Sequence, residues 1–188
     1  MDKWYNSKKI FVKVHSDSTI RMDKKTYSVP SRTIGQTLSA YVYPDKIELM
    51  FGDKLIETIS KKDKGNVHID FKHVIGSLMK KPKAFEDYKY KECLYPNIFF
   101  RETYDKLKKD FSETKANKSY IEILNLAKVY TLKDVSNIID LMLKANITPT
   151  ANEIKQFLTF NINVPEINIR EANLSDYDEL IGGAYAIQ

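Results

Sequence analysis

The chain has 188 residues and a formal net charge of +5, and 43% of its residues are hydrophobic and 29% charged. This composition is typical of a folded globular protein, and no apolar run approaches the ~18 residues that a membrane-spanning helix requires. Cys93 is the single cysteine, which excludes an internal disulfide and fits a reducing compartment, so we expect a cytoplasmic protein.

The basic charge is concentrated in the first half of the chain. Residues 1–91 hold 19 Lys and Arg against 11 Asp and Glu, residues 92–160 hold 10 against nine, and residues 161–188 hold one against five. Such asymmetry indicates a polyanionic partner for the basic part. The alternative is a lysine-rich surface that is merely solvated.

Short strands are predicted from the N-terminal side onward. Residues 10–15 alternate between apolar and polar side chains, and turns lead from there into strands at 19–22 and 26–29. Pro30 ends the third strand because proline has no backbone donor. In the loop that follows, Gly35 is expected to take a positive φ.

Three further strands follow as a meander. Residues 37–43 and 46–51 alternate with a period of two, residues 55–59 are less regular, and the two-residue turn signals Pro44-Asp45 and Gly52-Asp53 lie between the three runs. Ile47, Leu49 and Phe51 are expected to point inward.

A meander this short has to close or be covered to hide its edges. The sequence therefore predicts an α+β protein that begins with a small antiparallel SH3-like β-barrel over residues 9–65. Residues 66–91 are expected to form a helix, capped by Asp70, that covers the barrel, followed by a basic linker. Residues 80–95 have no clean period and are the best candidate for a domain boundary.

A helical domain is predicted over residues 92–160, and its first helix starts near Pro96. Capping signals at Ser119, Thr131 and Thr150 predict three more helix starts. The short connections between these helices favour antiparallel neighbours and a small bundle.

Residues 161–188 are predicted to form an extended, acidic docking tail. They contain too many apolar side chains for a solvated end. The tail could fold back onto the basic part of the chain, dock on a neighbouring protomer, or pack on the helical bundle as a strap.

Several stretches together resemble one family. Residues 27–30 read Tyr-Ser-Val-Pro, Gly35 follows, and residues 47–56 read IELMFGDKLI after a turn at Asp45; the segments HVIGSLMKKPKAF and LSDYDEL lie further on. Their order resembles the C-terminal region of IstA-type insertion-sequence transposases and their Mu-type relatives, and the resemblance covers most of residues 10–181.

The resemblance implies a non-catalytic region that binds double-stranded DNA at transposon ends and holds transposase protomers together. It implies that an integrase-like core lies upstream, so that the whole parent would be a DDE-type transposase. It also implies an AAA+ ATPase helper of the IstB type as a partner.

Signatures of catalysis, cofactors and metals are not found in the sequence. His15, His68 and His73 have no metal-ligand spacing, Cys93 has no CxxC partner, and no glycine-rich phosphate loop is present. No cofactor is expected. An enzyme would remain open if the fold revealed a deep pocket lined by converging acids.

Basic residues at predicted turns and in the exit segment are the candidate DNA contacts. They are Lys24, Lys25, Arg32, Lys46, Lys61, Lys62, Lys64, Lys80, Lys81 and Lys83. Such cations contact phosphates without reading sequence. Four tyrosines, at 41, 43, 88 and 90, could stack on bases, although packing inside the protein is favoured. The alternative function is a protein–protein interaction module that does not contact DNA.

Overall fold

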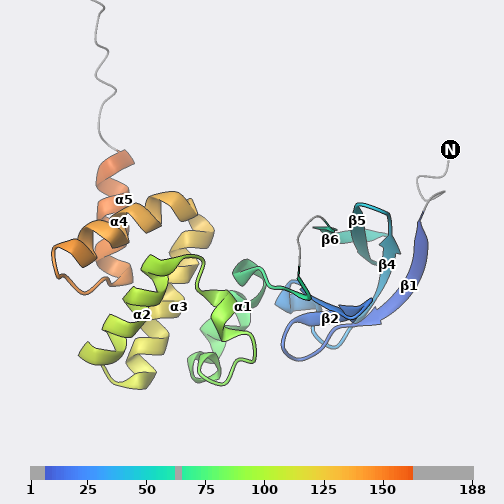
Figure 1. Ribbon diagram of the computed structural model, residues 1–188, viewed down its shortest axis with the longest axis horizontal. Coiled ribbons are helices and arrows are strands. Elements are labelled where there is room, and N and C mark those ends of the chain that lie inside the picture. The colour runs from blue at the N-terminus through green and yellow to red at the C-terminus, as the bar shows by residue number, and fades with distance from the viewer. Residues whose placement is uncertain (1–6, 62–64, 163–188) are drawn as a thin grey trace, which may run out of the picture.

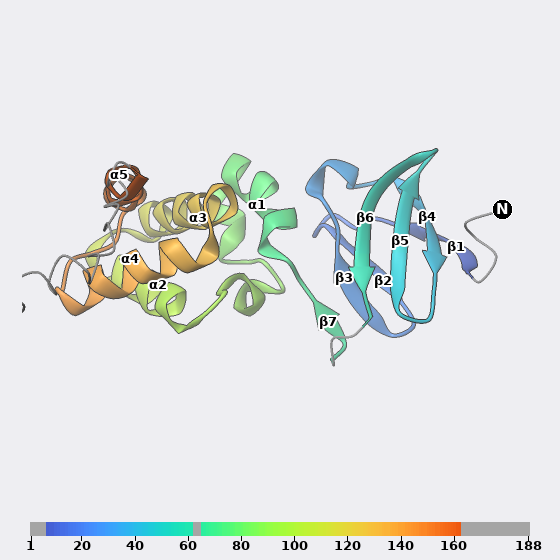
Figure 2. The ribbon, with the colours of Figure 1, turned by 90° about the horizontal axis from the view of Figure 1, so that it is seen from above.

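The computed structural model describes residues 7–61 and 65–162. Figure 1 shows two parts side by side, a strand region (residues 7–61 and 65–68) and a helical region (residues 71–162). Helix α1 is the helix nearest the strand region in Figures 1 and 2, and α5 lies at the far end. Most of the predicted tail 161–188, from residue 163 on, lies outside the described residues, as do Lys62 and Lys64.

The strand region contains two sheets. A four-stranded antiparallel sheet has the order β1 (Lys8–Lys13), β4 (Thr37–Val42), β5 (Lys46–Phe51) and β6 (Lys54–Ser60). The second sheet has the order β2 (Thr19–Met22), β3 (Lys25–Ser28) and β7 (Val67–His68). Strands β2 and β3 are antiparallel, whereas the short β7, which the sequence did not predict, pairs in parallel with β3.

Both sheets contribute to one hydrophobic core. Its buried side chains are Val12, Val14, Ile20, Met22, Tyr27, Val29, Leu38, Ala40, Ile47 and Leu49. The antiparallel pairs β4–β5 and β5–β6 confirm the predicted meander. The strand pairs among the described residues make two sheets, and a closed barrel is not found among them.

The predicted register is right at two positions and wrong at the third. Ile47 and Leu49 are fully buried, but Phe51 is 48% exposed. Phe51 ends its strand beside the hairpin turn at Gly52, and a β-bulge between Leu49 and Met50 shifts the pairing with β6 just before it. The extra residue of the bulge is Ile56 on β6, which is partly buried against this core, whereas Phe51 lies at the open end of β5 beside the turn. The expectation for Gly35 is confirmed, since its φ is 81°.

The helical region has five helices and two short 3-10 turns within the described residues, and the strand region has one 3-10 turn. The helices are α1 (Phe71–Lys80), α2 (Ile98–Asp110), α3 (Glu113–Val129), α4 (Leu132–Lys144) and α5 (Ala151–Ile162). The 3-10 turns are η1 (Ser31–Thr33) in the strand region and η2 (Pro82–Phe85) and η3 (Lys91–Leu94) between α1 and α2. Among the described residues, no helix is both long enough and apolar enough to cross a membrane.

The predicted helix starts have mixed outcomes. Thr131 accepts the Asp134 amide, and Thr150 exchanges hydrogen bonds with Glu153, so both caps are confirmed. Ser119 is wrong as a cap, because α3 begins six residues earlier and Ser119 lies inside it. The polar run before Ser119 has no apolar period and hid the first turns of this helix. Helix α2 begins at Ile98 with Asn97 as its cap, so the predicted start near Pro96 is confirmed.

The helical core begins well before residue 92. The buried residues of α1 (Phe71, Val74, Ile75 and Leu78) belong to it, so this helix packs mainly in the helical region. The segment expected to be a linker supplies Phe85 and Leu94, which are both fully buried. Helix α1 also lies against η1, where a Cβ on Gly76 would be 3.3 Å from the Ser31 hydroxyl oxygen.

Candidate nucleic-acid interface

The predicted DNA contacts come from several different elements of the fold. Lys24 is exposed in the turn between β2 and β3, with Lys25 half-buried beside it. Lys80, Lys81 and Lys83 are exposed some distance along the chain, at the end of α1 and in η2. Turns and helix ends thus place these cations on the surface, where they can reach a polyanion.

Two of the predicted contacts are held by the protein itself. The Lys46 ammonium lies 2.7 Å from the buried Glu48 carboxylate and 5.0 Å from the centre of the Tyr43 ring. The hydrogen bond to Glu48 raises the pKa of Lys46. Lys61 donates a hydrogen bond of 2.7 Å to the Tyr43 carbonyl. These two side chains would have to exchange an internal partner for a phosphate.

Arg32 is exposed in η1 and lies in a different setting from the other predicted cations. It lines a hollow of about 410 Å³ together with Lys72 of α1 and Lys128 near the end of α3. We call this the junction hollow, since its walls come from both regions. Lys72 and Lys128 were not among the predicted DNA contacts. Both lie far from Arg32 in the sequence, and no local pattern relates them to it.

The predicted stacking tyrosines are at least partly buried. Tyr88 donates its hydroxyl proton to the Asp17 carbonyl at 3.1 Å, and burial raises its pKa. Its ring meets Tyr90 edge to face. Tyr41 is half-buried on β4 with Lys9 over its ring. The contact of Tyr88 with Asp17 joins the helical region to the strand region, as a packing role requires.

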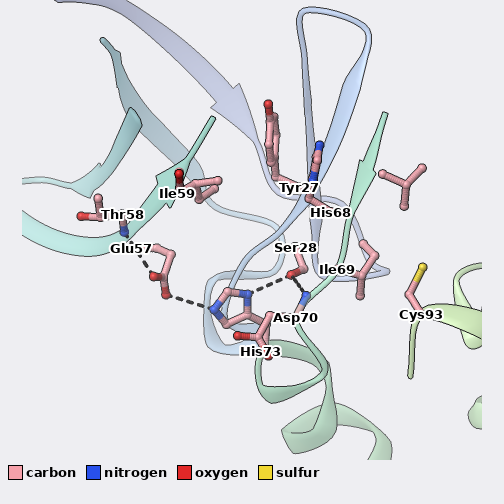
Figure 3. Close-up of a pocket in the computed structure, with 12 residues that line it drawn as sticks. Tyr27, Ser28, Glu57, Thr58, Ile59, His68, Ile69, Asp70, His73 and Cys93 are labelled. Carbon is pink, nitrogen blue, oxygen red and sulfur yellow. Dashed lines mark hydrogen bonds and ion pairs between the residues drawn. The ribbon is translucent and has the colours of Figure 1, made fainter. Parts of the chain in front are cut away.

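A chain of hydrogen bonds joins the two regions beside the junction hollow (Figure 3). The Ser28 hydroxyl on β3 lies 2.9 Å from His73 Nδ1 on α1, and His73 Nε2 lies 3.0 Å from the Glu57 carboxylate on β6. The Ser28 oxygen also accepts the Asp70 amide at 2.8 Å, while the Asp70 carboxylate caps α1 by accepting the Lys72 amide. Three elements are thus tied at one point, which we call the Ser28–His73–Glu57 clamp.

The clamp has the residue types of a nucleophile, a base and an acid, but its geometry favours structure over catalysis. Ser28 is only 3% exposed, and its oxygen is occupied by a backbone amide. A substrate carbonyl therefore cannot approach it in this arrangement. The adjoining hollow of about 430 Å³ also contains Cys93, whose thiol pKa is raised by burial, the opposite of an activated thiol.

Converging acids are not found in this hollow either. Its two carboxylates, Glu57 and Asp70, are each committed to a partner. Within residues 7–61 and 65–162, no group of three His, Cys, Asp or Glu side chains could hold a metal ion.

Comparison with known proteins adds evidence of ancestry. Residues 5–62 match the family model described as "Mu transposase, C-terminal domain". This match supports a Mu-type transposase relative. It suggests a role related to transposition, and because that domain is non-catalytic, it is consistent with no enzyme activity in this part of the chain.

A second comparison covers nearly the whole chain. An uncharacterized protein of Sinorhizobium fredii, y4jA/y4nE/y4sE, is 27% identical over 197 residues. The alignment includes 94% of this chain but only 36% of that protein, so the chain spans little more than a third of its curated relative. No solved structure matches the chain.

Proposed function

We propose that this chain is the C-terminal region of an IstA-type insertion-sequence transposase, placed after an integrase-like catalytic core. In this role it binds double-stranded DNA at transposon ends and helps to assemble transposase protomers. The catalytic steps belong to the upstream core of a DDE-type parent. The site of action is the bacterial cytoplasm, on DNA of the nucleoid.

The observation that carries this proposal is the position of the family match. Residues 5–62 coincide with the strand region, and the basic excess of the chain lies in residues 1–91. A transposase domain with an excess of Lys and Arg has the charge that a phosphate backbone requires. Further partners in the proposal are the other transposase protomers and an AAA+ ATPase helper of the IstB type.

Fluorescence anisotropy with labelled duplex DNA tests the proposal. We expect the purified chain to bind a transposon-end duplex and an unrelated duplex with similar affinity, and both affinities to fall steeply as salt rises. No nicking of either duplex is expected with Mg²⁺. Absence of binding at low salt would contradict DNA binding, and Mg²⁺-dependent nicking that disappears on changing an acid of this chain would contradict a non-catalytic role.

One observation favours the alternative, a protein–protein interaction module without DNA contact. Leu141, Ile147 and Phe157 are large apolar side chains that stay exposed around a hollow between α4 and α5. Such a patch is typical of protein contacts, and a second transposase protomer would be its occupant. Sedimentation of the wild-type chain and of Leu141→Asp, together with the anisotropy measurement, separates the two candidate functions. A dimer that is lost in the variant, with no DNA binding by either protein, would favour the interaction module.

A further inference from the structure

We propose that the junction hollow is a binding site for the backbone phosphates of duplex DNA. The inference rests on the proposed function and names the surface that carries it. The hollow brings together three cations from distant parts of the sequence: Arg32 from the strand region, and Lys72 and Lys128 from the helical region.

These three cations are available to a ligand. All three side chains are exposed, and their charged groups have no ion pair or hydrogen bond with any residue in the described ranges 7–61 and 65–162. Lys46 and Lys61, by contrast, already have internal partners. A cation that contacts only water can bind a phosphate at a lower free-energy cost than a cation that must first break an internal ion pair or hydrogen bond.

The local charge balance favours an anion. Among the described residues, Glu57 is the one carboxylate that lines the junction hollow, and it lies 3.0 Å from His73 Nε2 within the clamp. The described lining of the hollow therefore contains three cations and one carboxylate, and that carboxylate already contacts His73. An anion with several negative oxygens, such as a run of phosphodiesters, is the ligand that this balance favours.

The walls of the junction hollow are held in place by contacts between the two regions. Gly76 has no side chain at the point where α1 meets η1, and any Cβ there would crowd the Ser31 hydroxyl at 3.3 Å. The clamp holds α1 against β3 and β6 at the same place. The cations thus project from a preorganised floor, which lowers the entropic cost of binding compared with lysines in loose loops.

The openness of the junction hollow indicates the kind of ligand that it can bind. The three cations are themselves exposed to solvent, so the hollow does not enclose what it binds. An open, basic surface fits a stretch of polymer backbone, whereas small molecules are usually bound in enclosed and mostly apolar pockets. Because phosphate contacts carry no sequence information, the site would position the DNA rather than select its sequence.

A triple variant of the full 188-residue chain tests the inference. Arg32→Ala, Lys72→Ala and Lys128→Ala together remove three charges, and Lys109→Ala, Lys118→Ala and Lys133→Ala remove three exposed charges from the helical region as a matched control. Both proteins should keep the melting temperature of the wild type. We expect the hollow variant to lower the log–log salt slope of duplex binding by up to about 2.7, at about 0.9 for each lost contact, and the control to leave it nearly unchanged.

A conservative variant separates charge from shape. Arg32→Lys, Lys72→Arg and Lys128→Arg together keep the three charges, and we expect duplex binding close to that of the wild type. If the wild type binds duplex DNA and the hollow variant behaves like the control, the junction hollow is overturned while DNA binding stands. If the wild type itself does not bind, the proposed function and this inference both fail.

Discussion

The strand region and the helical region build their cores in different ways. Among the described residues, the strand region buries ten hydrophobic side chains, nearly all on alternating positions of its strands. The helical region buries 21, and its centre is a cluster of aromatic rings around Tyr120. Alternation can be recognised in the sequence, whereas the aromatic cluster is assembled from segments that have no shared period.

The aromatic cluster shows what this difference means for the boundary between the regions. Phe85 meets Tyr104 and Tyr120 at ring-centre distances of 5.2 Å each, and it comes from the irregular segment between α1 and α2. The buried Tyr120 hydroxyl donates to the Leu94 carbonyl of the same segment at 2.9 Å. The segment is therefore part of the helical core, even though its sequence resembles a linker.

The largest effect is expected from removing the Phe85 ring from this cluster. Phe85→Ala should destabilise the protein by about 3–5 kcal/mol, because a fully buried ring is replaced by a cavity. Urea unfolding measures this loss. Phe157→Ala, at a 52% exposed phenylalanine of α5, is the control and should change stability much less. Equal effects of the two changes would mean that residues 80–95 are a linker after all.

A slightly smaller effect is expected in the strand region. Leu49→Ala should cost about 2–5 kcal/mol, since Leu49 is fully buried between the sheets. Leu55→Ala on the neighbouring strand β6 is the control, because the side chain of Leu55 is 49% exposed. A loss at Leu55 as large as that at Leu49 would place the bulge of β5 and β6 in the wrong register.

The clamp between the regions should contribute less than either core. Ser28→Ala leaves the Asp70 amide and one His73 nitrogen without their partner, at a cost of about 1–3 kcal/mol. Ser112→Ala, at an exposed serine whose side chain makes no cap hydrogen bond, is the control. Calorimetry should show one unfolding transition for the wild type. For Ser28→Ala it should show two partly separated transitions, because the strand region and the helical region are then less tightly coupled. A Ser28 variant that is as stable and as cooperative as the control would show that the clamp does not couple the two regions.

The smallest effect is a dependence of stability on acid. Hydrogen bonds from Lys91 and then from Tyr104 lower the pKa of Glu86 to about 2. A carboxyl whose folded-state pKa is lowered stabilises the protein above its ordinary pKa of 4.5 and loses that contribution as the pH falls toward about 2. Glu86→Gln should therefore flatten the fall in stability over this range of pH. An unchanged acid profile would show that the contact is too solvated to matter.

How much of this architecture can be predicted depends on how local its causes are. The strands, the turn at Gly35 and the caps at Thr131 and Thr150 follow from neighbouring residues, and each is confirmed. The bulge at Ile56 depends on how β6 pairs with β5, and the start of α3 depends on packing of its first turns. Neither cause is visible in a periodic pattern.

The candidate site divides in the same way. The excess of positive charge in residues 1–91 can be counted, and it indicates a polyanion partner. The grouping of Arg32 with Lys72 and Lys128 depends on α1 crossing η1 at Gly76, a contact between residues far apart in the chain. The engagement of Lys46 and Lys61 by internal partners likewise depends on the folded sheet.

The central claim is that DNA is bound where the two regions meet. Hydrogen–deuterium exchange of the full chain, measured with and without a saturating duplex, tests it most directly. The account predicts slower exchange on binding in η1, in the first turns of α1 and near the end of α3, with no change in α4 and α5. Protection by DNA that leaves those three segments unchanged and appears elsewhere would contradict the claim.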